Sequence, residues 1–451
     1  MRLARRVRSV VSVGLGLLLL GALLAPAASA AATSPPDDQP LPGYTISNPP
    51  LPPATVGGQL AKVTQGVHSH AAYTIEVPPH WNGSLALWAH GYRGQGTVLT
   101  VDAPSYGLRQ QMLDQGYAWA ASSYYDNGYD VRSGVTTTRD LATLFGKLAG
   151  KPKQVFLAGV SMGGHVIGRS LEQYPGFYAG ALPMCGVLGD QTLFDGYYDY
   201  NLAAQDLAGV PAFPIPADYA TNAAPKIEAA LGLTALKPGG PDTTNERGAQ
   251  LRAITVNRTG GVRPGADNAF AYWKDFLFSI AVPSGGTTLA QNPGQVATNL
   301  FTRYQPNTPV NVNATVRRVP PANLAARLSP ALTQIPHIYG LPRVPVLTLH
   351  GLGDMFVPFS MEQAYRADVD RTGQGGLVVQ RAIRSVNHCE FDATEAGSAW
   401  NDLVRWVDTG HRPAGDVVDN PKTVASPTFG CRFTDPAAHA TGTRPLFPAC
   451  P

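Results

Sequence analysis

Short apolar runs alternate with helical segments along much of this chain, and this alternation constrains the fold more than any other feature. A run such as LALWAH (85–90) is nearly continuous in apolar residues, as expected for a strand buried on both faces. Further strands are expected at 117–121, 154–159, 179–186, 344–351 and 377–383, and helices near 105–115, 135–149, 163–174, 360–371 and 392–408. Strands that alternate with helices are typical of a parallel sheet covered by helices. The sequence therefore predicts an α/β protein with a doubly wound, mostly parallel sheet.

Two regions depart from this alternation. Between about 59 and 79, the stretches QLAKVTQGV and HAAYTIEVP alternate apolar and polar residues, which predicts an antiparallel pair of strands. Between Leu188 and Pro342 the alternation stops, and a structureless loop of this length would be unusual, so we expect a mainly helical inserted lid. The expected division is a signal peptide (1–30), a Pro-rich flexible leader (31–58), a core in two parts (59–188 and 343–410), the lid (189–342) and an irregular tail (411–451).

The first thirty residues have the pattern of a secretory signal peptide. Four arginines precede an apolar stretch from Val10 to Leu24, and Ala28-Ser29-Ala30 provides the small residues of a cleavage site, which we place after Ala30. An uncharged stretch of about 15 residues is short for a membrane anchor, which needs roughly 20. We therefore expect a secreted, extracellular bacterial protein without a membrane span.

Charge and cysteine content exclude some classes of partner. Removing the signal peptide takes away four of the 34 basic residues and none of the 31 acidic ones, which leaves a net charge near −1 and no reason to expect a nucleic-acid partner.

Four cysteines in an exported chain permit two disulfides. We favour Cys431 with Cys450, which are close together in the tail, and keep Cys185 with Cys389 as the remaining pair. No zinc-type spacing occurs, and we expect no metal or organic cofactor.

Ser161 lies in FLAGVSMGGH (156–165), directly after a predicted buried strand. A serine hydroxyl becomes a strong nucleophile only when a base accepts its proton and a carboxylate orients that base. Asp354 in HGLGDMFVP and His388 in RSVNHCEF each follow a predicted strand. Taken singly, the three residues have ordinary interpretations as a turn serine, a helix-capping aspartate and a surface histidine. Their joint order in the chain is that of an α/β-hydrolase catalytic triad.

Two backbone N–H groups are candidates for an oxyanion hole. Met162 begins the helix that follows Ser161, and its N–H and the helix dipole would stabilise a negative oxygen. Tyr92 lies in HGYRG, just after the strand at 85–90. Gly91 would let this loop approach the substrate oxygen closely.

Other residues near these motifs have alternative roles. Asp190 also follows a predicted strand, so it is a second candidate for the acid. His90 and His165 are close to the site in sequence, and we expect the first to orient the oxyanion loop and the second to pack in the nucleophile helix. The aromatic side chains of Tyr198 and Trp273 would either line a substrate pocket or form the core of the lid itself.

Four segments of the sequence are similar to segments of a known family. YTIEVPPHWNGSL, VPVLTLHGLGDMFVPFSMEQAY, NHCEF and SMGGH resemble the opening strand, acid segment, histidine segment and nucleophile motif of secreted bacterial serine hydrolases of the phthalyl amidase type. The broader resemblance, to the α/β-hydrolase superfamily, covers roughly residues 60–410. In that family, and in related tannases and feruloyl esterases, a cysteine just before the serine can pair with one just after the histidine. Here Val160 precedes the serine, so Cys389 is either free or paired with Cys185.

The resemblance and the triad together predict a secreted serine hydrolase that cleaves a carboxylic ester or amide through an acyl-enzyme. An aminopeptidase-like serine peptidase would use the same triad together with a lid carboxylate for the substrate's amine, and no Asp or Glu of the lid stands out for that role. A non-catalytic ligand-binding protein of this fold is the alternative from a different class. Such a protein usually lacks a triad member, and none is missing here.

Overall fold

A single sheet of eight strands organises the residues that the structure, a computed structural model, describes, namely 36–280, 296–306 and 308–450. Across the sheet the order is β12-β11-β10-β9-β6-β8-β5-β4. Strands from β12 to β8 run parallel, and β5 runs antiparallel to both of its neighbours. This is the α/β-hydrolase fold that the sequence predicts. The strands are β4 (Lys62–His68), β5 (Ala71–Val77), β6 (Ser84–Ala89), β8 (Ala118–Ser122), β9 (Gln154–Val160), β10 (Gly180–Met184), β11 (Val346–Gly351) and β12 (Val378–Ile383).

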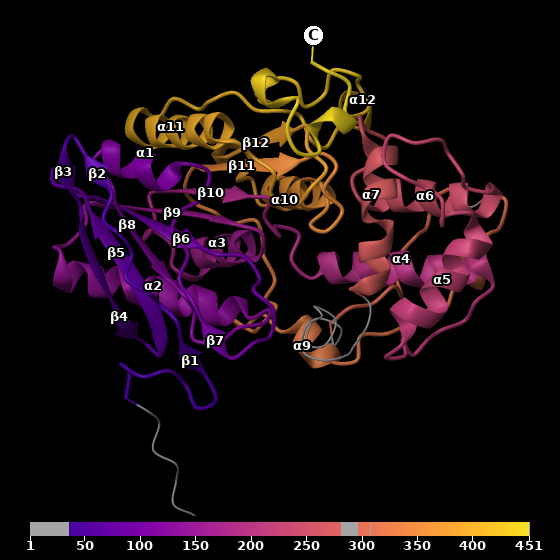
Figure 1. Cartoon of the computed structure of the whole chain (residues 1–451), viewed down its shortest axis with the longest axis horizontal. Helices are drawn as coiled ribbons and strands as arrows, with labels where there is room; N and C mark the ends of the chain where they lie inside the picture. The colour runs from indigo at the N-terminus through magenta and orange to yellow at the C-terminus, as the bar shows by residue number, and fades with distance from the viewer. Residues whose placement is uncertain (1–35, 281–295, 307, 451) are drawn as a thin grey trace, which may run out of the picture. The chain divides into compact units, whose positions relative to one another are not determined.

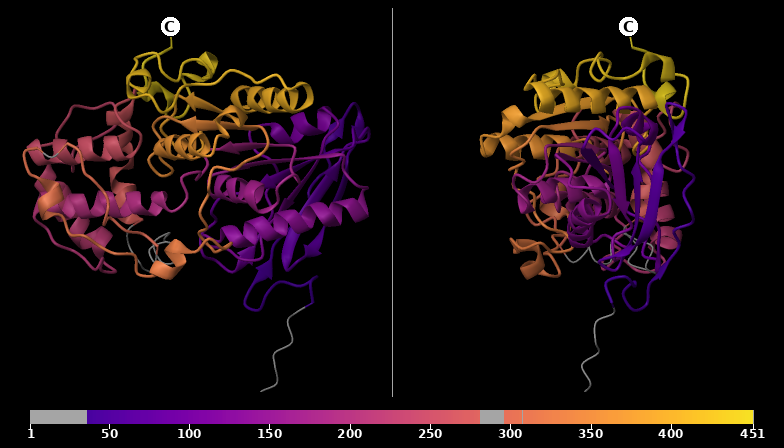
Figure 2. Two further views of the ribbon diagram at one scale, coloured as in Figure 1. Left: turned by 180° about the vertical axis from the view of Figure 1, so that it is seen from behind. Right: turned by 90° about the vertical axis from the view of Figure 1, so that its left-hand side faces the viewer.

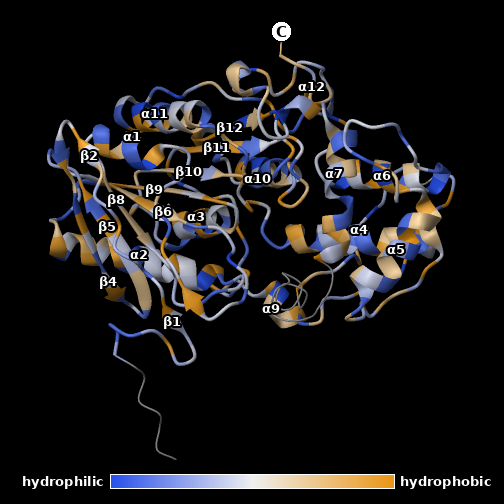
Figure 3. Cartoon of the chain, in the orientation of Figure 1, coloured by the Kyte–Doolittle hydropathy of each residue, from blue (hydrophilic) through white to orange (hydrophobic). Residues whose placement is uncertain are grey.

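The apolar runs are continuous because helices cover both faces of the sheet (Figures 1 and 2). In β9, Val155 and Leu157 pack into one core cluster, while Phe156 and Ala158 pack into the other. Figure 3 shows hydrophobic residues along the strands between the helical layers. The first face is covered by α2 (Val131–Leu148), α3 (Met162–Gln173) and α10 (Ser360–Arg371), and the second by α1 (Leu108–Asp114) and α11 (Ala393–Thr409).

The regular structure among the described residues of the insert is helical, with irregular segments between the helices, which confirms its expected mainly helical character. Helix α4 contacts α5, α6 and α7, and Figure 1 shows these four helices gathered in one group. Helices α4 and α5 end at Gly209 and Gly232, whose φ angles of 68° and 71° suit glycine because it has no side chain. The helices are α4 (Thr192–Ala208), α5 (Tyr219–Leu231), α6 (Glu246–Arg258), α7 (Ala266–Ser279), α8 (Val312–Thr315) and α9 (Leu324–Leu328).

Residues 36–58 differ from the flexible leader that the sequence suggests. They contain short strands of two separate two-stranded sheets, and they hydrogen-bond to the main sheet, for example from the Ala54 N–H to the buried carboxylate of Glu76 at 2.7 Å. A strand of two residues has no periodicity, and for this reason the sequence pattern does not indicate it. The paired segments are β1 (Thr45–Ile46) with β7 (Val98–Leu99), and β2 (Thr55–Val56) with β3 (Gln59–Leu60).

The described part of the tail, 411–450, contains one short α-helix, α12 (Pro421–Val424), and two short 3₁₀ helices. It is tied to the core by Arg384, whose guanidinium donates to the carbonyls of Phe429 and Pro448 at 3.0 and 2.9 Å. Both predicted disulfides, Cys431–Cys450 and Cys185–Cys389, are present.

The predicted signal peptide, 1–30, lies outside the described residues. Within the part of the chain that is described, no helix is both long and apolar enough to cross a membrane.

Candidate active site

Ser161 occupies the sharp turn between β9 and α3. Its φ and ψ are 56° and −123°, a left-handed conformation that is strained for a residue with a side chain. The Ser161 N–H donates to the carbonyl of Met184 in the neighbouring strand β10 at 3.1 Å, which holds the turn against the sheet. Such a strained strand-to-helix turn presents the serine hydroxyl above the end of the strand.

The glycines on either side of Ser161 allow this turn to pack against β6. A Cβ atom on Gly159 or Gly163 would lie only 2.2 or 2.1 Å from the carbonyl oxygen of Ala89. Any side chain at either position would therefore force the turn away from the sheet. The glycines at positions 159 and 163 thus have a steric role.

The structure brings the three predicted triad residues together. The Ser161 hydroxyl lies 2.8 Å from His388 Nε2, and His388 Nδ1 lies 2.5 Å from a carboxylate oxygen of Asp354. Asp354 is fully buried, whereas Ser161 is 9% exposed. Because the carboxylate can only accept, Nδ1–H donates to it and Nε2 is left to accept the serine proton.

Asp354 is fixed by the loop between β11 and α10. Its second carboxylate oxygen accepts the N–H groups of Phe356 and Val357 at 3.0 and 2.9 Å. The Phe356 ring packs edge-on against the His388 imidazole, with ring centres 4.8 Å apart. The loop therefore orients both the carboxylate and the histidine that it contacts.

The loop after β6 passes directly over the nucleophile. A Cβ on Gly91 would lie 3.0 Å from the Ser161 Cβ and 3.5 Å from its Oγ, so a glycine allows this close approach. Both oxyanion candidates adjoin this contact, since Tyr92 follows Gly91 and Met162 is the first residue of α3. The N–H groups of a first helical turn have no partner within the helix and can bind an anion.

The two nearby histidines lie in the positions expected of them. His90 is buried against the ring of Tyr124, with ring centres 3.8 Å apart and its Nδ1 2.7 Å from the Gly91 carbonyl oxygen. Burial lowers the pKa of His90 to about 3, so the ring is neutral. His165 lies inside α3, where Nε2–H donates to the Pro336 carbonyl at 2.7 Å, and burial lowers its pKa to about 4.

Asp190, the alternative acid, is occupied elsewhere. Its carboxylate accepts the N–H of Ile338 at 2.9 Å and faces His337 Nδ1 at 3.2 Å. These partners belong to the segment that returns from the insert to the core, and the hydrogen bond to His388 Nδ1 is made by Asp354 and not by Asp190.

The two aromatic candidates for substrate binding differ in their surroundings. Tyr198 packs edge-on against Phe213 inside the insert, at 6.3 Å between ring centres. Trp273, on α7, is only 5% exposed, and its indole N–H donates to the carbonyls of Gly353 and Val386 at 3.1 and 2.9 Å. Because those carbonyls belong to the acid loop and the histidine loop, Trp273 links the insert to both.

Two further residues support these loops, and no sequence motif indicates them. Arg263 is fully buried, and its Nε donates to the carbonyl of Leu352 at 2.6 Å, next to the acid loop. Burial lowers the pKa of Arg263 to about 10, against the opposing effect of the Asp354 charge, so the side chain stays protonated at neutral pH. In the tail, Thr443 Oγ1 accepts the N–H groups of Val386 and Asn387 at 2.8 and 3.0 Å.

The Cys185–Cys389 disulfide joins the end of β10 to the histidine loop. In this chain Val160, and not a cysteine, precedes Ser161, and Cys389 is paired with Cys185. The Cys389 sulfur lies 3.3 Å from His388 Nε2. These two sulfurs and the imidazole form a compact group, but sulfurs in a disulfide offer no thiolate to a metal ion.

Replacing Trp273 with Phe is expected to reduce any hydrolytic rate about 10- to 100-fold, with KM changed little. The ring would still pack, but two loop carbonyls would lose their donor and the loops would shift by a fraction of an ångström. Steady-state kinetics and urea unfolding of the variant measure both effects. Trp81→Phe is a matched control, since Trp81 donates to the Ser84 carbonyl at 2.8 Å at the opposite end of β6. Equal rate losses in the two variants would argue against a positioning role for Trp273.

No protein-family model matches the chain. Over 432 residues it is 21% identical to the o-phthalyl amidase of Xanthobacter agilis, in an alignment that covers 78% of this chain and 91% of that protein. An esterase structure from Aspergillus oryzae has a TM-score of 0.45 and 15% identity over 78% of this chain and 80% of its own. The structure of feruloyl esterase B from the same organism has a TM-score of 0.39 and 13% identity, and the match covers 78% of this chain and 82% of that chain.

The amidase match confirms the resemblance to the phthalyl amidase type that the sequence motifs indicate. Taken with the strand order, it supports a hydrolase with the α/β-hydrolase fold.

Proposed function

We propose that this chain is a secreted serine hydrolase that cleaves a carboxylic ester or amide. One observation carries the proposal: Ser161, His388 and Asp354 form a continuous chain of hydrogen bonds, with contacts of 2.8 and 2.5 Å. The strained turn at Ser161 and the glycine loop beside it support the same chemistry. Export is supported by the signal-like pattern of residues 1–30 and by the two disulfides.

The proposed reaction follows from the geometry. His388 Nε2 accepts the proton of Ser161 as Oγ attacks the substrate carbonyl carbon, and the backbone N–H groups of Met162 and Tyr92 bind the resulting oxyanion. His388 then gives its proton to the leaving alcohol or amine. Water, deprotonated by His388, attacks the acyl-enzyme, releases the carboxylic acid and restores the serine. Asp354 stays ionised throughout and stabilises the imidazolium.

The proposed organisation follows the same reasoning. We assign 59–188 and 343–410 to the catalytic core, 189–342 to the lid and 411–451 to a tail that supports the histidine loop. The contacts of Trp273 with the acid and histidine loops support a lid that is coupled to catalysis.

A fluorophosphonate probe tests the nucleophile without knowledge of the substrate. We expect the mature protein to be labelled once, and peptide mass spectrometry to locate the label on Ser161. Hydrolysis of aryl esters and aryl amides that share one acyl group then measures the ester-to-amide preference. Preference for amino-acid anilides with a free amine over their N-acylated forms would indicate the aminopeptidase alternative. An unlabelled Ser161 and no hydrolysis would support a non-catalytic binding protein.

A further inference from the structure

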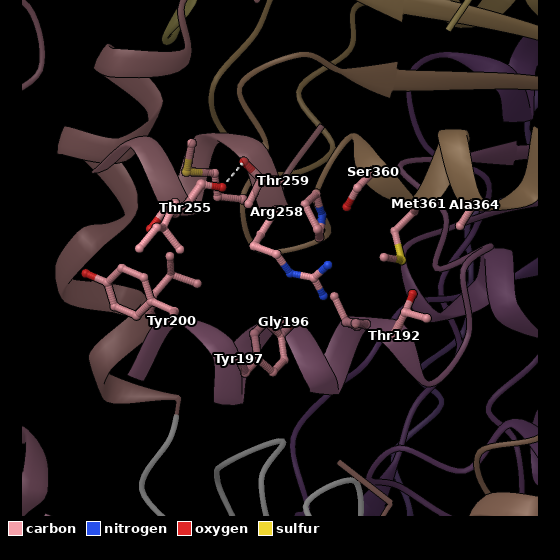
Figure 4. Close-up of a pocket in the computed structure, with 15 residues that line it drawn as sticks. Thr192, Gly196, Tyr197, Tyr200, Thr255, Arg258, Thr259, Ser360, Met361 and Ala364 are labelled. Carbon is pink, nitrogen blue, oxygen red and sulfur yellow. Dashed lines mark hydrogen bonds between the residues drawn. The ribbon is translucent and has the colours of Figure 1, made fainter. Parts of the chain in front are cut away.

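A cavity of about 220 Å³ lies between helices α4, α6 and α7 of the insert and the segment that runs from the acid loop into α10 (Figure 4). Most of its lining is apolar, including Leu193, Ile254 and Leu277. Met355 and Pro358 of the acid loop close one side. Neither Ser161 nor His388 is among the lining residues, so the cavity is separate from the candidate active site.

One charged side chain reaches into this cavity. Figure 4 shows the guanidinium of Arg258, at the end of α6, extending into the space between α4 and α10. Its Nε and Nη2 lie 2.8 and 2.7 Å from one carboxylate oxygen of Asp199, and Asp199 also accepts the Tyr304 hydroxyl at 3.0 Å. Asp199 is buried, whereas the Arg258 side chain is 35% exposed. Because arginine has five N–H donors, the guanidinium is held in place by Asp199 and still has donors for a second acceptor.

A glycine keeps the cavity open. Gly196 lies within α4 and lines the cavity, and a Cβ on it would have no atom within 4 Å. Glycine inside a helix is less stable than alanine, and no close packing requires a glycine here. The missing side chain instead preserves the space beside the Arg258 guanidinium.

We propose that this cavity binds a small organic monocarboxylate, with the carboxylate on Arg258 and an apolar body, aromatic or branched, against the surrounding side chains. A guanidinium is the side chain best suited to bind a carboxylate with two hydrogen bonds. An apolar cavity of roughly 150 Å³ holds a benzene molecule, so the space here accommodates one ring with its carboxylate. The ligand is a free acid rather than part of the scissile substrate, because the cavity is not lined by the nucleophile or the base. This assignment does not depend on the proposed hydrolytic activity.

Isothermal titration of the full-length mature protein with benzoate tests the proposal, with benzamide as a neutral ligand of the same size. We expect one benzoate per chain, and at least about tenfold weaker binding of benzamide, which lacks the charge. Gly196→Leu should abolish benzoate binding by filling the cavity, while leaving the Arg258–Asp199 pair intact. Arg258→Gln should weaken benzoate binding at least about tenfold. Arg252→Gln, which alters an arginine of the same helix paired with Asp242 at 2.8 Å, should leave it unchanged.

Thermal unfolding of each variant separates loss of the site from loss of the fold, since Arg258→Gln leaves the buried Asp199 without its cation. Equal affinities for benzoate and benzamide, or benzoate binding that survives Gly196→Leu, would overturn the proposal. Benzoate should not compete with a neutral aryl ester for the active site. Competitive inhibition that Gly196→Leu removes would instead make the cavity part of the substrate site and refute a separate one. Because the titration measures binding and not hydrolysis, the test remains valid for a protein without hydrolytic activity.

Discussion

Ser161→Ala is expected to lower kcat for aryl ester hydrolysis by about 10⁵- to 10⁶-fold and to abolish fluorophosphonate labelling. The alanine removes the only atom that would attack the carbonyl, so the remaining rate would come from substrate binding and the oxyanion donors. Alanine would adopt the same left-handed conformation, with φ of 56°, that serine already adopts. We therefore expect the free energy of unfolding to stay nearly unchanged.

Ser170→Ala is a matched control for this prediction. Ser170 is buried in the same helix, α3, and takes no part in the hydrogen bonds that join Ser161, His388 and Asp354. The control should retain both the rate and the label. If Ser161→Ala retained wild-type activity and the fluorophosphonate labelled another residue of the same chain, the nucleophile assignment would fail. Wild-type activity in a Ser161→Ala protein that carries no label would instead indicate a contaminating hydrolase.

The sheet could be predicted because its evidence is local in the sequence. Each central strand is a short apolar run, such as β9, that is buried on both faces, and each is followed by a helix or a polar loop. In a parallel sheet the loops after neighbouring strands meet at one edge. That geometry is why Ser161, Asp354 and His388 could be named from motifs alone and are then found in contact.

The supporting residues could not be predicted because their partners are distant and are backbone atoms. Trp273 donates to carbonyls 80 and 113 residues further along the chain, and a carbonyl is present at every residue. From the sequence, the Trp273 ring could therefore belong either to a pocket wall or to the core of the lid. In the structure, the contacts that link it to the two loops are made by its indole N–H. Arg263 and Thr443 are similar cases, since their acceptors and donors are main-chain groups of the two loops.

The cavity at Arg258 could not be predicted from the sequence for a different reason. Its walls come from three helices of the insert, the acid loop and α10, and no run of sequence contains more than a few of the lining residues. The open space is recognised only from the absence of neighbours around Gly196. Sequence patterns record which residues are present and do not record where packing is incomplete.

Asp354→Asn is expected to lower kcat about 10⁴-fold at neutral pH while the loop keeps its conformation. The remaining amide oxygen can still accept the N–H groups of Phe356 and Val357. The amide NH₂ would face His388 Nδ1 and favour the tautomer that carries its proton on Nε2. In that tautomer Nε2 cannot accept the proton of Ser161, and no negative charge stabilises the imidazolium that forms.

The same substitution changes the surroundings of Arg263, which is buried and protonated and would lose the favourable field of the Asp354 carboxylate. We therefore expect a lower urea midpoint for the variant, and rates should be compared where both proteins are fully folded. Asp190→Asn is the control that discriminates between the two acids proposed from the sequence. It should lower stability through its contacts with His337 and Ile338 and leave kcat unchanged. A 10⁴-fold loss in Asp190→Asn together with a small effect in Asp354→Asn would reverse the assignment, because only the carboxylate that holds the base in its reactive tautomer can affect the rate to that extent.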